Sequence, residues 1–414
     1  MMDVVVSRCA GIDIGKAEVV VCLRVPGPGR KRVSEVRTFR AFTGEIERLA
    51  SWLAEHRVTH VVMEATGQYW KPVWDVLDEH GFELMLVNAR HVKIVPGRKT
   101  DVADAVWLAE LLEHGLLRGS FVPPRVIREL RDLTRYRKRL VQAHTSEGQR
   151  IAKILEDAGI KLDSVVSHLM GVSGRAMLRA LIAGQRDPDQ LAEMARGRLR
   201  PKIPMLVEAL NGRFGEHHAL MIGLALDHFE YLERMTVHLD ERIDTLMSEH
   251  TAARDRLDTI PGVGKRAAEV IIAEIGADMN VFPTAKHLAS WARMCPGNNI
   301  TGGKRRSGTT GGGNRWLRET LVECAWAASR QRDSYLAAQF WRLARRIGKK
   351  KAALAVGHSI LAIAWHLLHD NTSYTDLGGD WFVRRIDNNS RRRDRLIGEL
   401  QGMGYLVSLE QAAS

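Results

Sequence analysis

The sequence predicts a mixed α/β domain at the N-terminus, followed by an all-α remainder that includes a coiled-coil segment. Residues 1–115 alternate short, β-branched apolar runs with amphipathic stretches of helical period. Residues 222–246 repeat apolar side chains in heptads, and the chain beyond residue 257 has a helical pattern around one glycine-rich loop. With 414 residues, the chain is long enough for two or three domains. The predicted divisions are 1–122, 123–256, 257–370 and 371–414.

The first domain should contain three antiparallel strands and then alternate helices and strands. Two apolar, β-branched runs flank the short turn Gly15–Lys16, which predicts a hairpin. The predicted elements, in order, are strands Cys9–Ile14, Val19–Val25 and Val33–Phe42, a helix over Gly44–His56 capped by Thr43, strand His60–Glu64, a helix over Tyr69–His80 ended by Gly81, strand Glu83–Val87 and a helix over Thr100–His114. This order gives a mixed sheet with helices on its faces.

The middle of the chain is helical. Pro123–Pro124 marks a domain boundary, after which Val126–Leu155 forms a basic helix and Gly159–Gly215 breaks into short helices. The heptads then predict a coiled coil, with an amphipathic bundle helix inside the same chain as the alternative. The two core positions are occupied by Ile222, Phe229, Thr236 and Ile243, and by Ala225, Leu232, Leu239 and Leu246.

Positive charge is concentrated in one stretch. The whole chain carries a net charge of +12, and Thr301–Lys351 contributes thirteen basic against three acidic residues. Aromatic side chains, among them Trp316, Trp326, Tyr335 and Trp341, lie among these cations. A solvated helix face is the alternative for any single charge run, but this concentration favours contact with nucleic acid. A second basic cluster, between Arg384 and Arg395, lies in the tail.

Several classes of protein are excluded. Residues Met1–Ala10 carry no secretory signal, and the apolar run Ala352–Leu368 looks too short to cross a bilayer, so we expect no membrane role. The four cysteines are widely spaced without a C-x-x-C pair, which argues against a zinc site or a disulfide framework. We therefore expect a cytoplasmic protein with reduced thiols.

Four acidic residues in the first domain stand where metal chemistry would need them. Asp13 lies inside an apolar strand, Glu64 ends another strand, and Asp101 and Asp104 share one helix face. Buried carboxylates are costly unless they are neutralised, and divalent cations would neutralise them. Mg²⁺, with Mn²⁺ as the alternative, prefers such oxygens, and a pair of ions can clamp a phosphodiester. Taken alone, Asp101 and Asp104 could simply favour the helix dipole.

A second motif, Ile260-Pro261-Gly262-Val263-Gly264-Lys265, joins two predicted helices. Its glycines would let backbone amides approach a phosphate, at a helix N-terminus with positive potential. The motif resembles the helix-hairpin-helix element that holds the DNA backbone, so we expect Gly262, Gly264 and Lys265 to bind nucleic acid. A tight turn between helices is the alternative.

The glycine-rich loop Pro296–Gly313 combines hydroxyls with cations. Thr301 and Ser307 flank Lys304, Arg305 and Arg306, and a hydroxyl attacking phosphorus needs positive charge nearby. Both hydroxyls qualify as nucleophiles on chemistry alone, and the alternative is a loop whose hydroxyls only satisfy turns. We expect the three cations to contact nucleic acid, as we do the residues that follow the loop, Asn314, Arg315 and Arg318.

These motifs resemble the insertion-sequence-110 family of DEDD transposases. The N-terminal likeness rests on GIDIGK, MEATGQYW, LMLVNARHVK and KTDVADAVWLAE, and the C-terminal one on IPGVGKRAAEVIIAEIG, SWARMCPGNN and GGGNRWLRETL. The resemblance implies a RuvC-like domain whose catalytic, metal-binding acids are Asp13, Glu64, Asp101 and Asp104. It also implies a serine nucleophile five residues after the loop proline, where this chain has Thr301. Threonine is β-branched and bulkier, so its attack could be slower, or Ser307 could serve instead.

The resemblance further implies partners. Members of the family use a noncoding bridge RNA that pairs with both donor and target DNA, so that pairing reads sequence while protein holds backbones. It implies a transient covalent protein–DNA intermediate and an active site shared between subunits of a dimer, or of a tetramer on DNA, with the heptad segment as dimerisation element. A bacterial, nucleoid-associated location follows. The alternatives are a catalytically impaired nucleic-acid-binding descendant and, because GIDIGK suits its phosphate loop, an actin-like ATPase.

Overall fold

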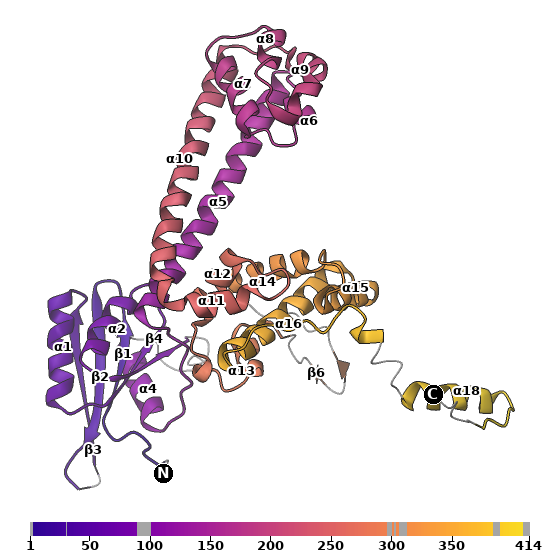
Figure 1. Ribbon diagram of the computed structural model, residues 1–414. Coiled ribbons are helices and arrows are strands. Elements are labelled where there is room, and N and C mark those ends of the chain that lie inside the picture. The colour runs from indigo at the N-terminus through magenta and orange to yellow at the C-terminus, as the bar shows by residue number, and fades with distance from the viewer. Residues whose placement is uncertain are drawn as a thin grey trace. The chain divides into compact units, whose positions relative to one another are not determined.

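A computed structural model gives the structure of residues 3–29, 31–88, 101–295, 300–301, 304–305, 313–383 and 390–408, without the side chains of 101, 300–301, 304–305 and 390–395. The chain divides into two compact units, Met1–Val122 and Pro123–Ser414. The predicted fold class is confirmed, because the first unit holds a mixed sheet with helices and the second is almost entirely helical (Figure 1).

The first unit is built on a five-stranded sheet. Its elements are β1 (Cys9–Ile14), β2 (Glu18–Pro26), β3 (Arg32–Arg40), α1 (Thr43–Glu55), β4 (His60–Glu64), α2 (Trp70–Glu79), β5 (Glu83–Val87) and α4 (Asp101–Glu113). The strand order is β3-β2-β1-β4-β5, with the first three strands antiparallel and with β4 and β5 parallel to β1. This is the ribonuclease-H-like strand order expected of the RuvC-like domain that the family resemblance implies.

One local prediction in this unit is wrong. Thr43 does not cap α1 but is its first residue, and the N-cap position is held by Phe42 in an extended conformation. The Phe42 carbonyl accepts from the Glu45 and Ile46 amides at 2.9 and 3.0 Å, so the first turn closes one residue earlier than a threonine cap would place it. The preference for a hydroxyl cap is a local propensity, and the chain leaving β3 overrides it.

Two helical layers cover the sheet. Alternation along β1 sends Ala10, Ile12 and Ile14 to one face, where they join a core formed with α1 and α2. The opposite face packs on α4, where Cys9 and Val62 meet Leu108. Strands β1, β2 and β4 are therefore buried on both faces, as their continuous apolar runs predict, whereas the edge strand β3 is mostly exposed.

A long helical hairpin begins the second unit. Its arms are α5 (Arg125–Asp157) and α10 (Glu216–Leu246), which run side by side (Figure 1). The predicted core positions Ile222, Phe229 and Ile243 are buried. The partner of this seam is α5 of the same chain, where the His144 ring contacts the Phe229 ring in a tilted arrangement with centroids 3.7 Å apart. The alternative of a bundle helix packed within the chain is thus the one the structure has.

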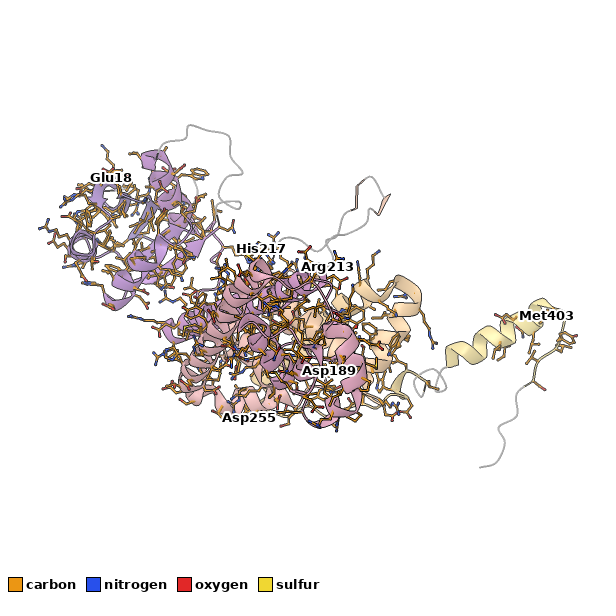
Figure 2. All side chains as sticks on the ribbon, turned by 90° about the horizontal axis from the view of Figure 1, so that it is seen from above. Glu18, Asp189, Arg213, His217, Asp255 and Met403 are labelled. Carbon is orange, nitrogen blue, oxygen red and sulfur yellow. The ribbon has the colours of Figure 1, made fainter. Side chains whose placement is uncertain are left out.

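Residues 159–215 form a small helical head at the end of the hairpin. Its helices are α6 (Leu162–Val165), α7 (Val172–Ile182), α8 (Pro188–Ala192), η1 (Gly197–Lys202) and α9 (Ile203–Leu210). They enclose an apolar core with the ends of α5 and α10, and Met177, Leu191 and Leu206 are fully buried in it. Exposed polar side chains cover the outside, among them the labelled Asp189, Arg213 and His217 (Figure 2).

The remaining elements follow the hairpin in the chain. They are η2 (Ser248–His250), α11 (Thr251–Asp258), α12 (Lys265–Ile275), η3 (Met279–Val281), α13 (Ala285–Trp291), β6 (Ile300–Thr301), β7 (Lys304–Arg305), α14 (Arg315–Ala328), α15 (Tyr335–Ile347), α16 (Lys349–His369) and α18 (Ser390–Gly402). Helix α16 contacts α11, α13, α14 and α15. Its Val356, Ile360 and Ala364 are fully buried, because they recur every four residues along the face that the other helices cover.

The expectation that the apolar run Ala352–Leu368 is too short to cross a bilayer is wrong for the helix that contains it, α16. The helix extends over 21 residues, and among the described helices it alone is long and apolar enough to cross a membrane by length and composition. More than half of its most apolar stretch is buried against other helices, which is the pattern of a core helix in a folded domain.

Candidate active site

Asp13 and Glu64 lie next to each other at one edge of the sheet. Strands β1 and β4 are parallel, with Ile12 paired to Met63, so the next step places Asp13 beside Glu64. Neighbouring strands are about 4.8 Å apart, which brings the two carboxylates within reach of shared ligands. Both side chains are half-buried, and alternation directs both toward the face that carries α4, together with Gly11 and Val62.

Helix α4 brings its first turn to the same place. The Cys9 thiol donates to the Ala109 carbonyl at 3.6 Å, while a Cβ on Gly11 would lie only 2.4 Å from the Ala105 carbonyl oxygen. The helix therefore runs antiparallel to β1, and the turn that begins with Asp101 lies toward Asp13. Asp104 is half-buried in that turn. The side chain of Asp101 lies outside the described part of the chain.

The donor chemistry of this edge fits a divalent metal ion. Among the described side chains, which omit that of Asp101, no three acidic, histidine or cysteine residues form a metal-binding group. Mg²⁺ is commonly held by only one or two carboxylates together with substrate phosphates, so a complete protein cage is not required. The residues that would hold it are Asp13, Glu64, Asp101 and Asp104.

Replacing Gly11 with alanine is expected to destabilise the first unit by about 1–3 kcal/mol. The new methyl group would clash with backbone atoms of α4 on both sides, at 2.4 Å from the Ala105 oxygen and 2.4 Å from the Ala109 nitrogen. Urea unfolding measures the change. Gly44→Ala is the matched control, because a Cβ at that helical position meets no atom within 4 Å. Equal stabilities for the two variants would contradict the close packing of α4 on β1.

The predicted hairpin motif joins α11 and α12, and its two glycines have different surroundings. Gly262 has φ +85°, and a Cβ there would lie 2.4 Å from the Cys324 carbonyl oxygen of α14. The absence of a side chain at Gly262 therefore lets α14 pack closely against the turn, a contact that was not predicted from the sequence. Gly264 is the N-cap of α12, and no atom lies within 4 Å of its missing Cβ. Within this turn, the space beside Gly264 is therefore unoccupied by other atoms of the described residues, whereas the space beside Gly262 is filled by α14.

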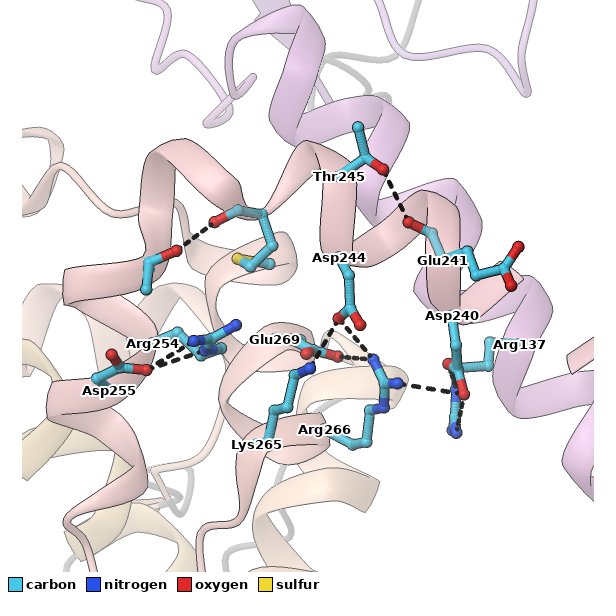
Figure 3. Close-up of polar contacts among 12 residues, drawn as sticks. Arg137, Asp240, Glu241, Asp244, Thr245, Arg254, Asp255, Lys265, Arg266 and Glu269 are labelled. Atoms are coloured by element: carbon cyan, nitrogen blue, oxygen red, sulfur yellow. Dashed lines mark hydrogen bonds and ion pairs between the residues drawn. The ribbon is translucent and has the colours of Figure 1, made fainter. Parts of the chain in front are cut away.

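The cations of the motif are engaged with the hairpin arm α10 (Figure 3). Lys265 Nζ lies 3.0 Å from the Asp244 carboxylate, and Arg266 contacts Asp240, Asp244 and Glu269 at 3.2, 3.2 and 2.9 Å. Burial acts to raise the pKa of Asp244, but the bond from Lys265 and the charge of Arg266 hold that pKa below its ordinary value. Half-exposed pairs of this kind contribute little to stability, and contact of Lys265 with nucleic acid stays a prediction.

The structure places Thr301 opposite a predicted cation. In the two-stranded sheet formed by β6 and β7, Thr301 pairs with Lys304 and Ile300 pairs with Arg305. A hydroxyl-bearing residue and two basic residues are therefore held on adjoining backbone segments. The side chains of these residues, and all of Arg306 and Ser307, lie outside the described part of the chain.

Both flanks of the loop are fixed to the helical core. Before it, the Cys295 sulfur lies 3.7 Å from His358 Nε2 of α16, and burial lowers the pKa of His358. After it, Asn314 caps α14 by accepting from the Leu317 amide at 3.1 Å, and it donates to the buried Glu274 carboxylate at 2.6 Å. Both ends of the Asn314 amide are thus engaged inside the protein, and its contact with nucleic acid stays a prediction.

Two other predicted contacts lie on α14. Arg315 is exposed and bonds Glu319 one turn later at 2.6 Å, which draws the pKa of Glu319 below its ordinary value although burial acts against this. Arg318 is half-buried. An exposed pair between residues four apart is weak, so Arg315 keeps its ability to bind a phosphate.

A buried carboxylate that the sequence interpretation missed organises this region. Glu274 is fully buried and accepts a two-point interaction from Arg135 of α5 at 2.7 and 2.8 Å, in addition to the bond from Asn314. Arg131 binds the Ala273 and Glu274 carbonyls at 3.1 and 2.8 Å. The network joins α5, α12 and the start of α14. The sequence feature that could have predicted this network is the position of Glu274, an acidic residue inside the apolar stretch at the C-terminal end of α12.

Replacing Arg135 with alanine is expected to lower the free energy of unfolding by about 3 kcal/mol. The change removes the two-point partner of the buried Glu274 carboxylate and leaves it only Asn314 and the more distant Arg131, at 3.4 Å, and a buried charge with a weakened partner set is costly. Thermal and urea unfolding report the loss. Arg125→Ala is the control, since Arg125 forms a solvent-exposed pair with Glu129 on the same helix at 3.4 Å, and its loss should change stability by less than about 1 kcal/mol. Similar losses in both variants would argue against the network.

Two family models match this chain. Residues 10–160 match a DEDD model of IS110 described as "Transposase", and residues 254–342 match one described as "Transposase IS116/IS110/IS902 family". Together the two regions span more than half of the chain and include all the predicted site residues.

Several known proteins are similar to this chain. "Putative transposase y4pF/y4sB" from Sinorhizobium fredii is 26% identical, over 78% of this chain and 76% of its own length. "Insertion element IS110 uncharacterized 43.6 kDa protein" from Streptomyces coelicolor is 25% identical, over 70% of this chain and 75% of its own. Among solved structures, "Thermus thermophilus RuvC structure" matches 26% of this chain and 93% of that protein, at 18% identity and a TM-score of 0.22. At that score the likeness adds nothing to the fold, which the strand order establishes.

Proposed function

Because this chain belongs to the IS110 family of transposases, we propose that it cuts and rejoins DNA with carboxylate-bound metal and a threonine nucleophile, guided by a noncoding RNA. As a transposase, it acts on DNA. The observation that carries the finer proposal is the parallel register of β1 and β4, which brings Asp13 beside Glu64 one residue beyond the Ile12–Met63 pair, with α4, begun by Asp101 and Asp104, packed over the same face. Four carboxylates at one sheet edge repel a phosphate unless cations are bound among them.

The chemistry assigns a separate role to each part. Mg²⁺ or Mn²⁺, held by Asp13, Glu64, Asp101 and Asp104, would polarise the reacting phosphate. The Thr301 hydroxyl attacks the phosphorus, its proton passes to solvent, and a new bond joins its oxygen to the DNA phosphate. The bond to the deoxyribose oxygen breaks, and that oxygen takes up a proton. Basic side chains near Thr301 stabilise the charge that develops in this transition state.

Guidance by RNA and assembly into dimers or tetramers belong to the same proposal. The excess positive charge after residue 300 suits the backbones of RNA and DNA together. In the structure the heptad seam is buried against α5, so an interface along the hairpin would use its outward residues, among them Leu220 and Leu224, which are 62% and 60% exposed. A shared active site would then combine the carboxylates of one subunit with the nucleophile of another.

A reconstituted reaction tests the proposal. The full chain is incubated with Mg²⁺, DNA carrying both ends of the encoding element, target DNA, and RNA transcribed from the noncoding flanks. Joined products and a covalent protein–DNA adduct are expected, and both should vanish with chelator or when the RNA is omitted. Products that form without metal would contradict the carboxylate site, and products that form without RNA would contradict guidance.

Two other functions predict different results. A catalytically impaired descendant would bind RNA and DNA with strong salt dependence but form no joined product. An actin-like ATPase would need a second sheet domain, whereas the described residues contain a single five-stranded sheet and one two-stranded hairpin. Measured ATP turnover would favour that function.

A further inference from the structure

We propose that the corner between α15 and α16 is a binding site for unpaired nucleotides, with one base stacked on Trp341 and the flanking phosphates on neighbouring cations. The inference rests on the proposed function, because the nucleic acid is the one on which the protein acts. It names a surface of the second unit that includes neither the acidic residues of the first unit nor the motif at Gly264. The surface, called here the α15–α16 corner, comprises Trp341, Arg342, Arg345, Arg346, Lys349, Lys350 and Lys351.

The cations of the corner lack acidic neighbours in the sequence. All six are exposed, and the residues between Asp333 and Asp370 include no acid at all. Among the described ion pairs, none involves any of these six side chains. Three lysines open α16, where the helix dipole disfavours positive charge, so their arrangement does not serve helix stability. Such a density of uncompensated charge selects a polyanion over a protein surface of ordinary composition.

Trp341 presents a fixed aromatic ring among these cations. Its side chain is 45% exposed, although tryptophan is usually well buried. The indole nitrogen donates to the Ser329 carbonyl at 3.0 Å, and the ring meets Phe340 edge-on at 5.2 Å, so its orientation is set. The Lys349 ammonium lies 5.6 Å from the ring centroid. A held and exposed ring of this kind is a platform on which a base can stack.

A hollow beside the ring gives the base a place. Trp341 lines a cavity of about 390 Å³ together with the loop Ser329–Ser334, Ala337 and Gly379. Arg330 and Arg332 of that loop add two more exposed cations, and Asp333 is the acid that lines the hollow. The polar loop can accept hydrogen bonds from base edges, as the rim of a small-molecule site does.

The geometry favours an unpaired strand over a duplex. Bases inside a duplex are stacked on one another and offer no free face to a single exposed ring, whereas unpaired bases can be splayed out onto an aromatic side chain. Single strands of RNA and DNA share this chemistry. Unpaired RNA and unpaired DNA both arise where two nucleic acids exchange base pairs. The test must therefore distinguish binding of single-stranded RNA from binding of single-stranded DNA.

Binding of short labelled oligonucleotides to the full-length protein tests the site. We expect Trp341→Ala to weaken binding of single-stranded RNA or DNA by about 5- to 100-fold, with little effect on duplex DNA. Trp341→Phe keeps an aromatic face and should retain most of the affinity. Tyr231→Ala is the matched control, since Tyr231 is an equally exposed aromatic (49%) on α10. Comparing RNA with DNA of the same sequence identifies the preferred strand.

A charge variant provides a second measurement. Combining Lys349→Ala, Lys350→Ala and Lys351→Ala should reduce the salt dependence of single-strand binding by about two units of log Kd per log salt. Unchanged affinity in folded Trp341→Ala, or an equal loss for duplex DNA, would overturn the inference. If Trp341→Ala does not fold, the affinity of Trp341→Phe for single strands is the deciding measurement. A loss of affinity in Trp341→Phe as large as that in the triple lysine variant would contradict stacking of a base on residue 341. If single-strand binding depends on Trp341 but the protein joins no DNA, the binding site at the α15–α16 corner is supported and the proposed reaction is contradicted.

Discussion

Replacing Thr301 with alanine is expected to abolish the covalent protein–DNA adduct and to lower strand joining by roughly 10⁴-fold or more. The variant has no oxygen that can form the phosphoester, while the backbone pairing of residue 301 with Lys304 has no requirement for the threonine side chain. RNA and DNA binding should be kept, because the change removes no charge. Denaturing gels of the reaction with labelled DNA measure the adduct, and binding assays on the same sample show that the complex still forms.

Two further variants separate the candidate nucleophiles. Thr301→Ser introduces the serine that the family resemblance implies at this position and removes a methyl group beside the hydroxyl, so joining should be as fast as in the native chain or faster. Ser307→Ala should leave the adduct intact. If Thr301→Ala still forms adducts and Ser307→Ala does not, the assignment is reversed and Ser307 is the nucleophile. If the adduct still forms in both single variants, neither Thr301 nor Ser307 is the unique nucleophile.

The sheet could be predicted closely because its signals are local. Strands β1, β4 and β5 have the predicted bounds, since each is a short β-branched run that ends at a turn or at a change of period. The positions of Asp13 and Glu64 in those strands, and of Asp104 in the helix after them, followed from the same patterns. What the sequence alone did not contain is the register of β1 against β4, which makes the two acids neighbours.

The second unit was harder because its decisive contacts join distant segments. The heptads of α10 fit a partner in another chain as well as they fit α5, and periodicity carries no information about which helix fills the seam. The close approach of Gly262 to α14, more than sixty residues away in sequence, could not be predicted from the local motif, and its contact with nucleic acid stays a prediction. Asn314 looked like a surface residue for the same reason. Its partner Glu274 lies forty residues earlier in the chain.

Asp13→Asn is expected to reduce strand cleavage by about a thousand-fold or more while leaving folding almost unchanged. Asparagine keeps the shape of the side chain but removes one of the two negative charges that sit side by side on β1 and β4. Less charge at this edge weakens metal binding, so activity should recover in part at higher Mg²⁺ or Mn²⁺ concentration. The half-buried position of Asp13 limits the effect on stability to about 0.5 kcal/mol, which urea unfolding can measure.

The pair of carboxylates predicts how two substitutions combine. If Asp13 and Glu64 share a metal ion, either change alone removes most of the activity, and Glu64→Gln added to Asp13→Asn costs little more, because groups that act as a unit are not additive. Independent roles would instead multiply the two losses. Asp227→Asn, a change at an exposed acid on α10, is the control and should leave cleavage intact. Native activity in Asp13→Asn would remove the sheet edge as the catalytic centre, whatever the fate of Thr301.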